Sequence, residues 1–161
     1  MGNHSSMKKI SMLAFLLIGI VLSSCDNKVV FEKNISLPEN RWEASNIVHL
    51  ETTIEDTSAA HNLYINIRNA GGYQFSNLFV FFTTTTPKGE IERDTVELTL
   101  ADERGKWLGD GLGDIWDNRI LFKRNFRFPQ SGIYKFDLQQ AMRVPILPQV
   151  MDAGIRIEKA E

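Results

Sequence analysis

The chain has 161 residues, of which 18 are Lys or Arg and 20 are Asp or Glu, so its formal charge at pH 7 is −2. This balance argues against nucleic-acid binding, which requires a clustered excess of basic residues. Cysteine occurs once, at Cys25. A single cysteine excludes an internal disulfide, and once it is acylated it also leaves no thiol for catalysis or for a metal ion.

A segment near the N-terminus is typical of a bacterial lipoprotein signal. Lys8 and Lys9 precede an apolar run over residues 10–22, and two small serines then lead into Cys25. The run is too short to cross a bilayer, which takes roughly 20 apolar residues. Similarity to lipobox proteins implies that the Cys25 sulfur receives diacylglycerol and that the new amino group receives a fatty acid such as palmitate. The alternatives are a short uncleaved anchor and a signal cleaved elsewhere.

Removal of residues 1–24 as a signal peptide leaves 137 residues, which is enough for one domain. It takes away two of the 18 basic residues and no acidic residue, so 16 basic residues remain against 20 acidic ones and the formal charge becomes −4. We expect residues 25–41 to form a lipidated tether that holds the domain clear of the bilayer, with a short strand at residues 29–33. We expect residues 42–161 to form the domain.

From Trp42 onward, apolar and polar residues alternate with a period of two, which is the pattern of a half-buried antiparallel strand. The alternating segments lie at residues 48–51, 63–68, 95–100, 120–128, 134–139 and 155–158. Residues 78–82 are apolar throughout and run into four threonines, which predicts a central strand covered on both faces for part of its length. Glycine- and proline-containing turns separate these segments. The sequence predicts an all-β protein, an antiparallel β-sandwich of seven to eight strands with a jelly-roll or immunoglobulin-like arrangement.

The least regular part of this pattern lies at residues 139–150. Pro145 and Pro148 block a long helix or strand there. Residues 139–143 precede both prolines and are predicted to form one helical turn.

Residues 102–117 have the most unusual local composition, with three alternating glycines, four aspartates and two tryptophans. The aspartates do not have the spacing of a calcium-binding loop, and the glycines do not match a dinucleotide-binding loop. We interpret the segment mainly as a constrained structural loop, with a partner surface and a metal site as alternatives. Trp107 and Trp116 either close one end of the sandwich or contact a partner; the first reading is favoured.

Signals for catalysis are few. The two histidines after Cys25, His49 and His61, form no metalloprotease motif, and no serine has the surroundings of a hydrolase nucleophile. Glu51 with Glu55 and Asp56 resembles a glycosidase carboxylate pair, but a solvated strand end explains these residues more simply. A small basic cluster at residues 123–127 is interpreted as an exposed strand face. We therefore predict a non-enzymatic protein without a cofactor or metal ion.

Several segments together resemble the gliding-motility lipoprotein family GldH of Bacteroidetes. They are LYINIRN (63–69), SNLFV (76–80), DTVE (94–97), LAD (100–102), GKWLGDGLGDI (105–115), FP (128–129), GIYKF (132–136), QAMR (140–143) and GIRIEK (154–159). The resemblance covers nearly the whole chain after the signal segment. It implies a lipoprotein needed by the gliding machinery and the associated type IX secretion apparatus of the cell envelope. It brings no catalytic residue with it.

Sequence and resemblance together predict a non-enzymatic envelope lipoprotein of the outer membrane, on its periplasmic or its surface face. Its expected partners are membrane lipid, through acylated Cys25, and other envelope proteins of the motility or secretion machinery, which the sandwich docks onto. The residues predicted to contact such a partner are Trp107, Asp110, Asp114, Trp116, Met142 and Arg143. The alternative prediction is a surface glycan-binding module, because sandwiches with aromatic residues on their loops commonly stack against sugars.

Overall fold

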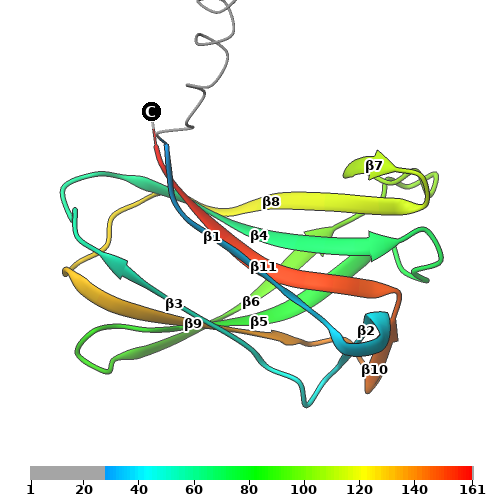
Figure 1. The fold of residues 1–161 in the computed structure, drawn as a ribbon, viewed down its shortest axis with the longest axis horizontal. Helices are drawn as coiled ribbons and strands as arrows, with labels where there is room; N and C mark the ends of the chain where they lie inside the picture. The colour runs from blue at the N-terminus through cyan, green and yellow to red at the C-terminus, as the bar shows by residue number, and fades with distance from the viewer. Residues whose placement is uncertain (1–27, 161) are drawn as a thin grey trace, which may run out of the picture.

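The computed structural model describes residues 28–160 and shows two antiparallel sheets packed face to face (Figure 1). The strands are β1 (Val29–Ser36), β2 (Arg41–Glu43), β3 (Val48–Ile54), β4 (His61–Ala70), β5 (Asn77–Thr85), β6 (Ile91–Thr99), β7 (Asp110–Leu112), β8 (Ile115–Phe126), β9 (Gly132–Gln140), β10 (Ile146–Pro148) and β11 (Val150–Lys159), with a 3-10 helix at Pro38–Asn40. Within these residues no helix has the length and apolar character needed to span a membrane. The signal segment and Cys25 lie outside the described residues.

The strand pairing is that of a jelly roll. One sheet has the order β1-β11-β4-β8-β7, a second has the order β3-β9-β5-β6, and β10 and β2 form a small third sheet. Among the eight long strands, the first pairs with the last, the second with the seventh, the third with the sixth and the fourth with the fifth. A long hairpin that folds over into two sheets produces this pairing. It selects the jelly roll from the two predicted arrangements.

The predicted β-sandwich is confirmed, but the described residues form eleven strands rather than seven to eight. The additional strands β2, β7 and β10 have three residues each, which is too short for a period-two pattern to reveal. The predicted helical turn at residues 139–143 is wrong. Strand β9 continues through Gln140, whose amide donates to the carbonyl oxygen of Val144 (2.9 Å) and accepts from the backbone N–H of Met142 (2.9 Å), so the chain bends instead of coiling.

The N-terminal strand is longer than predicted and belongs to the sheet. Strand β1 runs from Val29 to Ser36, three residues beyond the expected short strand, and pairs with β11 along its length. Phe31 and Ile35 on its inner face pack against the core. The sandwich therefore includes residues that the sequence analysis placed in a tether, because apolar contacts and a full ladder of hydrogen bonds hold them.

The core lies between the two large sheets. Inward-facing residues of β4 (Leu63, Ile65, Ile67) oppose those of the other sheet, and all three are at most 3% exposed. In β5, Leu78, Val80 and Phe82 point inward and are buried, whereas the outward-facing Phe79 and Phe81 are only half-buried. The guanidinium group of Arg93 lies over the Phe81 ring, with its Cζ atom 4.0 Å from the ring centroid. The predicted cover on both faces of this strand is thus complete on one face and partial on the other.

The strands run lengthwise between two ends of the sandwich, which we name here. The terminal end contains the start of β1, the end of β11 and the loops at residues 55–60, 86–90 and 127–131. The hairpin end contains the loops at residues 71–76, 100–109 and 141–145 and the β7–β8 hairpin. Figure 1 shows the terminal end on the left and the hairpin end on the right. Trp42, which is fully buried, packs at the hairpin end and donates from its indole nitrogen to the carbonyl oxygen of Asn46 (2.8 Å).

Candidate functional site

The glycine-rich segment forms a β-hairpin at the edge of the five-stranded sheet. Strand β7 pairs with the start of β8, and Gly113 and Asp114 make the two-residue turn between them. Gly113 has φ 64°, a conformation that glycine adopts at little cost. A Cβ at Gly111 would lie 2.2 Å from the indole ring of Trp116, so the ring rests directly on the glycine. The glycines therefore shape the hairpin.

This hairpin and the residues before it expose large apolar side chains. Leu112 at the hairpin tip is 87% exposed, and Leu108 is 57% exposed. Ile115, opposite Leu112, is 37% exposed, and Trp116 is half-buried. We call Leu108, Leu112 and Ile115 the hairpin patch; Trp116 pairs with Gly111 and lies on the other face of the hairpin. Exposed apolar residues concentrated in one segment mark a surface that binds another molecule more often than scattered ones do.

Trp107 lies beside this hairpin in a second surface feature, a cleft. Its ring is half-buried against the core, with its centroid 6.4 Å from that of Tyr73, which in turn contacts Phe75 edge to face at 5.7 Å. The carboxylate of Asp102 accepts from the backbone N–H groups of residues 104 and 106 (2.9 Å each) and holds the loop in shape. Trp107 thus both packs on the core and lines a cleft at the surface.

Met142 lines an apolar groove next to the Trp107 cleft. The groove is lined by Phe75, Phe79, Ala141, Met142, Arg143 and Val144. The Met142 sulfur accepts from the backbone N–H of Phe79 (3.3 Å), which fixes the side chain over β5. Phe75 lines both the groove and the Trp107 cleft, so the two adjoin. The tertiary structure thus brings together residues 107 and 142, which lie far apart in the sequence.

The remaining predicted contact residues occupy other parts of the hairpin end. Asp114 is exposed in the hairpin turn, and its carbonyl oxygen accepts from the backbone N–H of Gly71 (2.8 Å). Arg143 is exposed at the rim of the Met142 groove. Asp110 instead lines a polar cleft on the outer face of the five-stranded sheet. All six predicted residues lie at the hairpin end, but they face at least two different surfaces.

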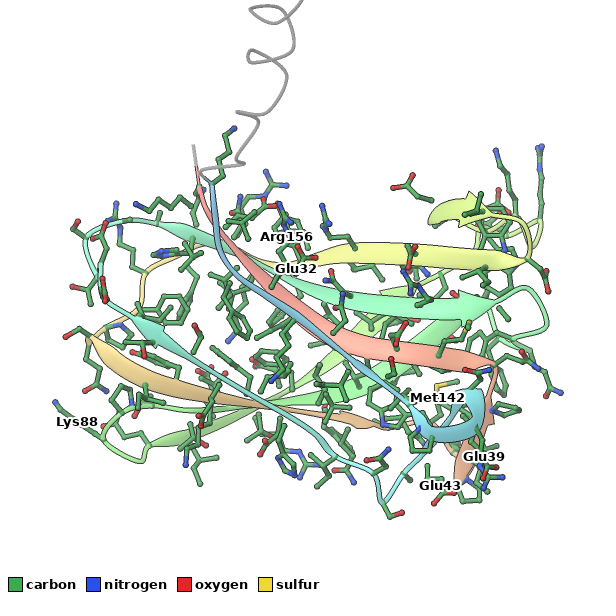
Figure 2. All side chains as sticks on the ribbon, viewed as in Figure 1. Glu32, Glu39, Glu43, Lys88, Met142 and Arg156 are labelled. Carbon is green, nitrogen blue, oxygen red and sulfur yellow. The ribbon has the colours of Figure 1, made fainter. Side chains whose placement is uncertain are left out.

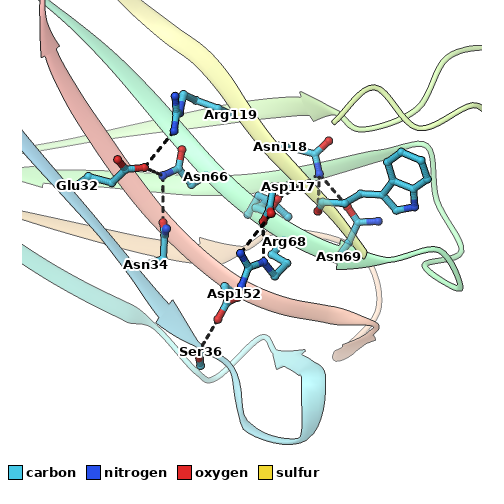
Figure 3. A network of polar contacts seen from close by, with 12 residues as sticks. Glu32, Asn34, Ser36, Asn66, Arg68, Asn69, Asp117, Asn118, Arg119 and Asp152 are labelled. Atoms are coloured by element: carbon cyan, nitrogen blue, oxygen red, sulfur yellow. Dashed lines mark hydrogen bonds and ion pairs between the residues drawn. The ribbon is translucent and has the colours of Figure 1, made fainter. Parts of the chain in front are cut away.

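The polar cleft has a volume of about 500 Å³ and crosses strands β1, β11, β4 and β8. Figure 3 shows its side chains bridging neighbouring strands. Arg68 forms two bonds to the carboxylate of Asp117 (2.6 and 3.2 Å) and one to Asp152 (3.1 Å), which also accepts from the Ser36 hydroxyl (2.6 Å). The bonds to Asp117 raise the pKa of Arg68 above its usual value. The guanidinium therefore stays charged at any relevant pH.

A second group of contacts in this cleft surrounds Asn66. Its amide nitrogen donates to Glu32 (2.9 Å) and Asn34 (3.0 Å), and Glu32 also pairs with Arg119 (3.4 Å) and Arg156. The amide oxygen of Asn66 is buried and has no hydrogen-bond partner among the described residues. The cleft thus offers hydrogen-bonding groups of the kind that recognise hydroxyl-rich ligands. The side chains that line it include no aromatic ring for stacking.

The residues considered for catalysis make contacts that are typical of structural residues. His49 and Asp137 are an exposed cross-strand pair (2.6 Å). His61 is buried and packs edge to face on Phe128. Asp56 accepts hydrogen bonds from Ser58 and Ala59 in the 55–60 loop, which lower its pKa, and Glu51 lies opposite Lys135 in the β3–β9 ladder. Within residues 28–160 no three acidic, histidine or cysteine side chains are grouped to hold a metal ion.

Several residues of these surfaces were not predicted from the sequence. Leu112 has the clearest signal in retrospect, because a large apolar residue between two glycines in a turn segment has no strand pattern to explain it. Tyr73 and Phe75 follow a Gly-Gly turn and carry no such signal. Their role depends on their proximity to Trp107 and Met142, which only the fold creates.

The family of this chain follows from comparison with known proteins. The family model described as "GldH lipoprotein" matches residues 29–157, almost the whole sandwich. The chain belongs to the GldH lipoprotein family. The resemblance inferred from the sequence is thereby confirmed.

Two GldH relatives match over nearly their full length. A protein of Christiangramia forsetii named "Gliding motility lipoprotein GldH homolog" is 36% identical over 158 residues, covering 94% of this chain and 96% of the relative. The "Gliding motility lipoprotein GldH" of Flavobacterium johnsoniae is 33% identical over 153 residues, covering 91% and 94%. Among solved structures, a chain of infectious bursal disease virus strain Gx has a TM-score of 0.30 and 8% identity, over 83% of this chain and 33% of that one.

Proposed function

We propose that this GldH-family protein is a non-enzymatic lipoprotein of the cell envelope that supports gliding motility and the associated type IX secretion machinery by binding other envelope proteins. The observation that carries the proposal is its family membership, with relatives named as gliding motility lipoproteins that it matches over more than nine-tenths of their length. The surroundings of His49, His61 and Asp56 support the non-enzymatic part, because each has a structural partner.

Anchoring is the first part of this proposal. The lipobox pattern assigns diacylglycerol and a further acyl chain, of the palmitate type, to Cys25. One acyl chain gives only reversible membrane binding, whereas two or three hold a protein stably. We place the protein in the outer membrane. A Cys25→Ser variant is expected to leave the membrane fraction, and retention there would contradict the assignment.

Docking through the hairpin end is the second part. This end carries the hairpin patch and, beside it, the Trp107 cleft and the Met142 groove. Aromatic residues and methionine are enriched where proteins bind one another, and charged residues are depleted there. The hairpin end therefore supplies a candidate contact surface for another envelope protein.

In-cell crosslinking of the full-length lipoprotein, followed by mass spectrometry, tests this docking. Leu112→Asp is the variant of choice because the side chain is 87% exposed, so a charge there leaves the fold intact. Ile133→Asp is the matched control, since Ile133 is 54% exposed at the terminal end. We expect the wild type and Ile133→Asp to recover motility or secretion components and Leu112→Asp to lose them. Equal recovery with both variants would contradict docking at the hairpin patch.

Glycan binding is a second candidate function, favoured by the polar cleft. Its unpartnered Asn66 oxygen and its array of amide, carboxylate and guanidinium groups match the hydrogen-bonding needs of a sugar. A glycan array with the full-length protein tests this function. Binding that is lost in Asn66→Ala would support it, and an array without reproducible binding would leave docking as the function.

A further inference from the structure

Strand β6 is an open edge of the sandwich. It is the last strand of the four-stranded sheet, and among the described residues it pairs only with β5. It runs from the 86–90 loop at the terminal end to the 100–109 loop at the hairpin end. In Figure 2, Lys88 lies at the first of these ends and Met142 at the second. An edge strand presents unpaired backbone groups that can pair with a strand of another chain.

Hydrogen bonds at the two ends of β6 determine which of its backbone groups are open. The N–H of Leu100 donates to the carbonyl oxygen of Ser76 (2.8 Å), and the carbonyl oxygen of Glu90 accepts from the N–H of Thr86 (2.9 Å). The register between β5 and β6 is unbroken between these bonds, so the even-numbered residues direct their backbone groups toward β5. The odd-numbered residues direct theirs to the open side. These are Ile91, Arg93, Thr95, Glu97 and Thr99.

The other edges of the two large sheets are less suited to a second strand. The pairing of β1 with β11 and of β8 with β4 contains register shifts, and such irregularities twist an edge away from a partner. Strand β3 is regular, but its middle residue is Glu51. Antiparallel pairing of two copies of β3 at full overlap would place these like charges opposite each other, which is destabilising. Strand β6 has neither obstacle.

The charges that β6 directs into the sandwich are held by the other sheet. The ammonium of Lys123 on β8 lies 3.6 Å from the carboxylate of Glu92 and 2.8 Å from that of Asp94. Inward-pointing charges at an edge oppose the addition of a strand when they are left without a partner. Here two carboxylates share one ammonium within the same copy. The favourable charge contacts of a pairing must therefore come from the outward-facing side chains.

These outward-facing side chains are complementary to a second copy of the same strand. In two antiparallel copies at full overlap, Thr95 lies opposite Thr95, and Arg93 of each copy lies opposite Glu97 of the other. All three side chains are exposed. Opposite charges on directly opposed residues stabilise a strand pair. A slide by two residues, the smallest that keeps each side chain on its face, removes both charge pairs, and in one direction it places Asp94 opposite itself.

We propose that β6 pairs antiparallel with β6 of a second copy about a twofold axis at Thr95, so that the four strands of each copy join into one sheet of eight. The open backbone groups then form about ten hydrogen bonds between the copies. A typical protein–protein interface contains about that number. Because both copies use the same surface, the contact is closed and stops at a dimer.

This dimer is compatible with the proposed acylation of Cys25, although it does not require it. Antiparallel pairing places the terminal ends of the two copies at opposite ends of the dimer. The twofold axis is perpendicular to the joined sheet, so both five-stranded sheets, which contain β1, lie on the same side of it. Both connections to lipid therefore leave one side of the dimer and can reach the same bilayer.

Disulfide crosslinking of the full-length protein in cell membranes tests the register, with the wild type as the background. Opposed residues of a hydrogen-bonded pair have Cα atoms about 5.5 Å apart, so Thr95→Cys should form a disulfide between the copies on mild oxidation. Two controls are matched. Thr99→Cys lies on the same strand, where the two copies of this residue would be about 26 Å apart, and Thr53→Cys is exposed on the β3 edge.

We expect at least about five-fold more crosslinked dimer from Thr95→Cys than from either control, because a disulfide bridges only Cα atoms closer than about 7 Å. Equal amounts from the three variants would show random collision in the membrane and would overturn the proposal. Absence of crosslinked dimer from Thr95→Cys would also overturn it.

Charge reversal tests the complementarity without a thiol, by analytical ultracentrifugation of the detergent-solubilised protein. Arg93→Glu and Glu97→Arg each place like charges opposite each other twice, so each should raise the dimer dissociation constant about ten-fold or more. The two changes together restore opposite charges and should restore the dimer. Lys135→Glu, exposed on β9 of the same sheet, is the control and should leave the dimer unchanged.

Thermal unfolding of each variant checks that the fold is retained. A monomeric wild type would overturn the proposal. A double variant that dimerises as weakly as the single variants would overturn the proposed register.

Discussion

Gly154 shows how one missing side chain determines a strand pairing. It lies in the middle of β11, between β1 and β4. A Cβ there would lie 2.2 Å from the carbonyl oxygen of Lys33 and 2.3 Å from the side-chain oxygen of Asn34. Real Cβ atoms do not approach backbone atoms so closely, so β1 can lie on β11 at this point only because residue 154 is glycine.

Gly154→Ala should therefore destabilise the protein by about 2 kcal/mol or more, because the new methyl group must displace the backbone of β1. Urea unfolding measures this change. Gly72→Ala is the control, since its Cβ would meet only Gln149 at an ordinary 3.6 Å. The control should change stability by less than about 0.5 kcal/mol. Equal stability of the two variants would show that β1 does not pack as described.

His61 is the residue whose burial makes stability depend on pH. It is 1% exposed, its Nδ1 atom has no hydrogen-bond partner among the described residues, and it packs on Phe128. Burial disfavours the imidazolium and lowers the pKa of His61 below its usual 6.5, although Asp56 partly opposes this. The unfolded chain therefore binds a proton more readily than the folded chain does.

We expect the free energy of unfolding to be fully maintained above pH 6.5 and to fall as the pH drops below it, because the unfolded state takes up a proton that folded His61 resists. His61→Leu should reduce this fall between pH 7.5 and 5, as measured by urea unfolding at each pH. His49→Leu, at a side chain that is 71% exposed, is the matched histidine control. An unchanged slope in His61→Leu would refute this role for His61.

At the scale of the element, the β7–β8 hairpin is built from glycines that each meet a different requirement. Gly113 supplies a positive φ in the turn, and Gly111 leaves room for the Trp116 ring on the opposite strand. The hairpin lies at the edge of the five-stranded sheet, and its tip carries Leu112 into solvent. The two glycines are therefore required by the local geometry of the hairpin. The exposed Leu112 at its tip contributes little to the core.

Gly111→Ala should move the Trp116 ring, because a Cβ would lie 2.2 Å from it. The chain has three tryptophans, so the indole N–H signals in an NMR spectrum resolve the effect. We expect the Trp116 signal to shift and the signal of buried Trp42 to stay in place. Stability should fall by less than about 1 kcal/mol, since the hairpin is at an edge. A shift of the Trp42 signal would indicate instead that the hairpin is coupled to the core.

At the scale of the whole molecule, the first and last strands close the sandwich together. Strand β1 is the edge strand that pairs with β11 on the side away from β4. Its inward residues Phe31 and Ile35 extend the core. The same strand begins four residues after Cys25, the proposed acylation site, so the proposed membrane connection and the closure of the fold depend on one segment. This arrangement makes the β1 region structural rather than a removable spacer.

Deletion of residues 29–36 should prevent formation of a stable monomer, because β11 would become an exposed edge and lose its apolar cover. Thermal unfolding and size-exclusion chromatography measure the outcome. The point variants Phe31→Ser, facing inward, and Val30→Ser, facing outward, provide a graded comparison. Phe31→Ser should lower the melting temperature and Val30→Ser should change it little. A stable, monomeric deletion variant would restore the tether interpretation.

Much of the fold was predictable from the sequence because apolar and polar residues alternate along the long strands. Segments such as 63–68 and 134–139 alternate clearly and are strands β4 and β9. The three-residue strands show no such alternation. Residues 139–143 were misassigned to a helical turn because the Gln140 side chain instead forms a local hydrogen bond to the carbonyl oxygen of Val144, four residues further on. Of the candidate surfaces, Trp107 and Met142 were selected from the sequence, whereas Phe75, which joins their clefts, was not.

The sequence by itself determined the features that depend on local pattern: the lipobox at Cys25, the alternating strands, the turn glycines and the resemblance to GldH. Only the tertiary structure decided which strands pair, that β1 belongs to the sheet, and which loops share an end of the sandwich. The physical reason is that strand pairing and surface clefts arise from contacts between residues far apart in the chain. Such contacts leave no periodic trace in a single sequence.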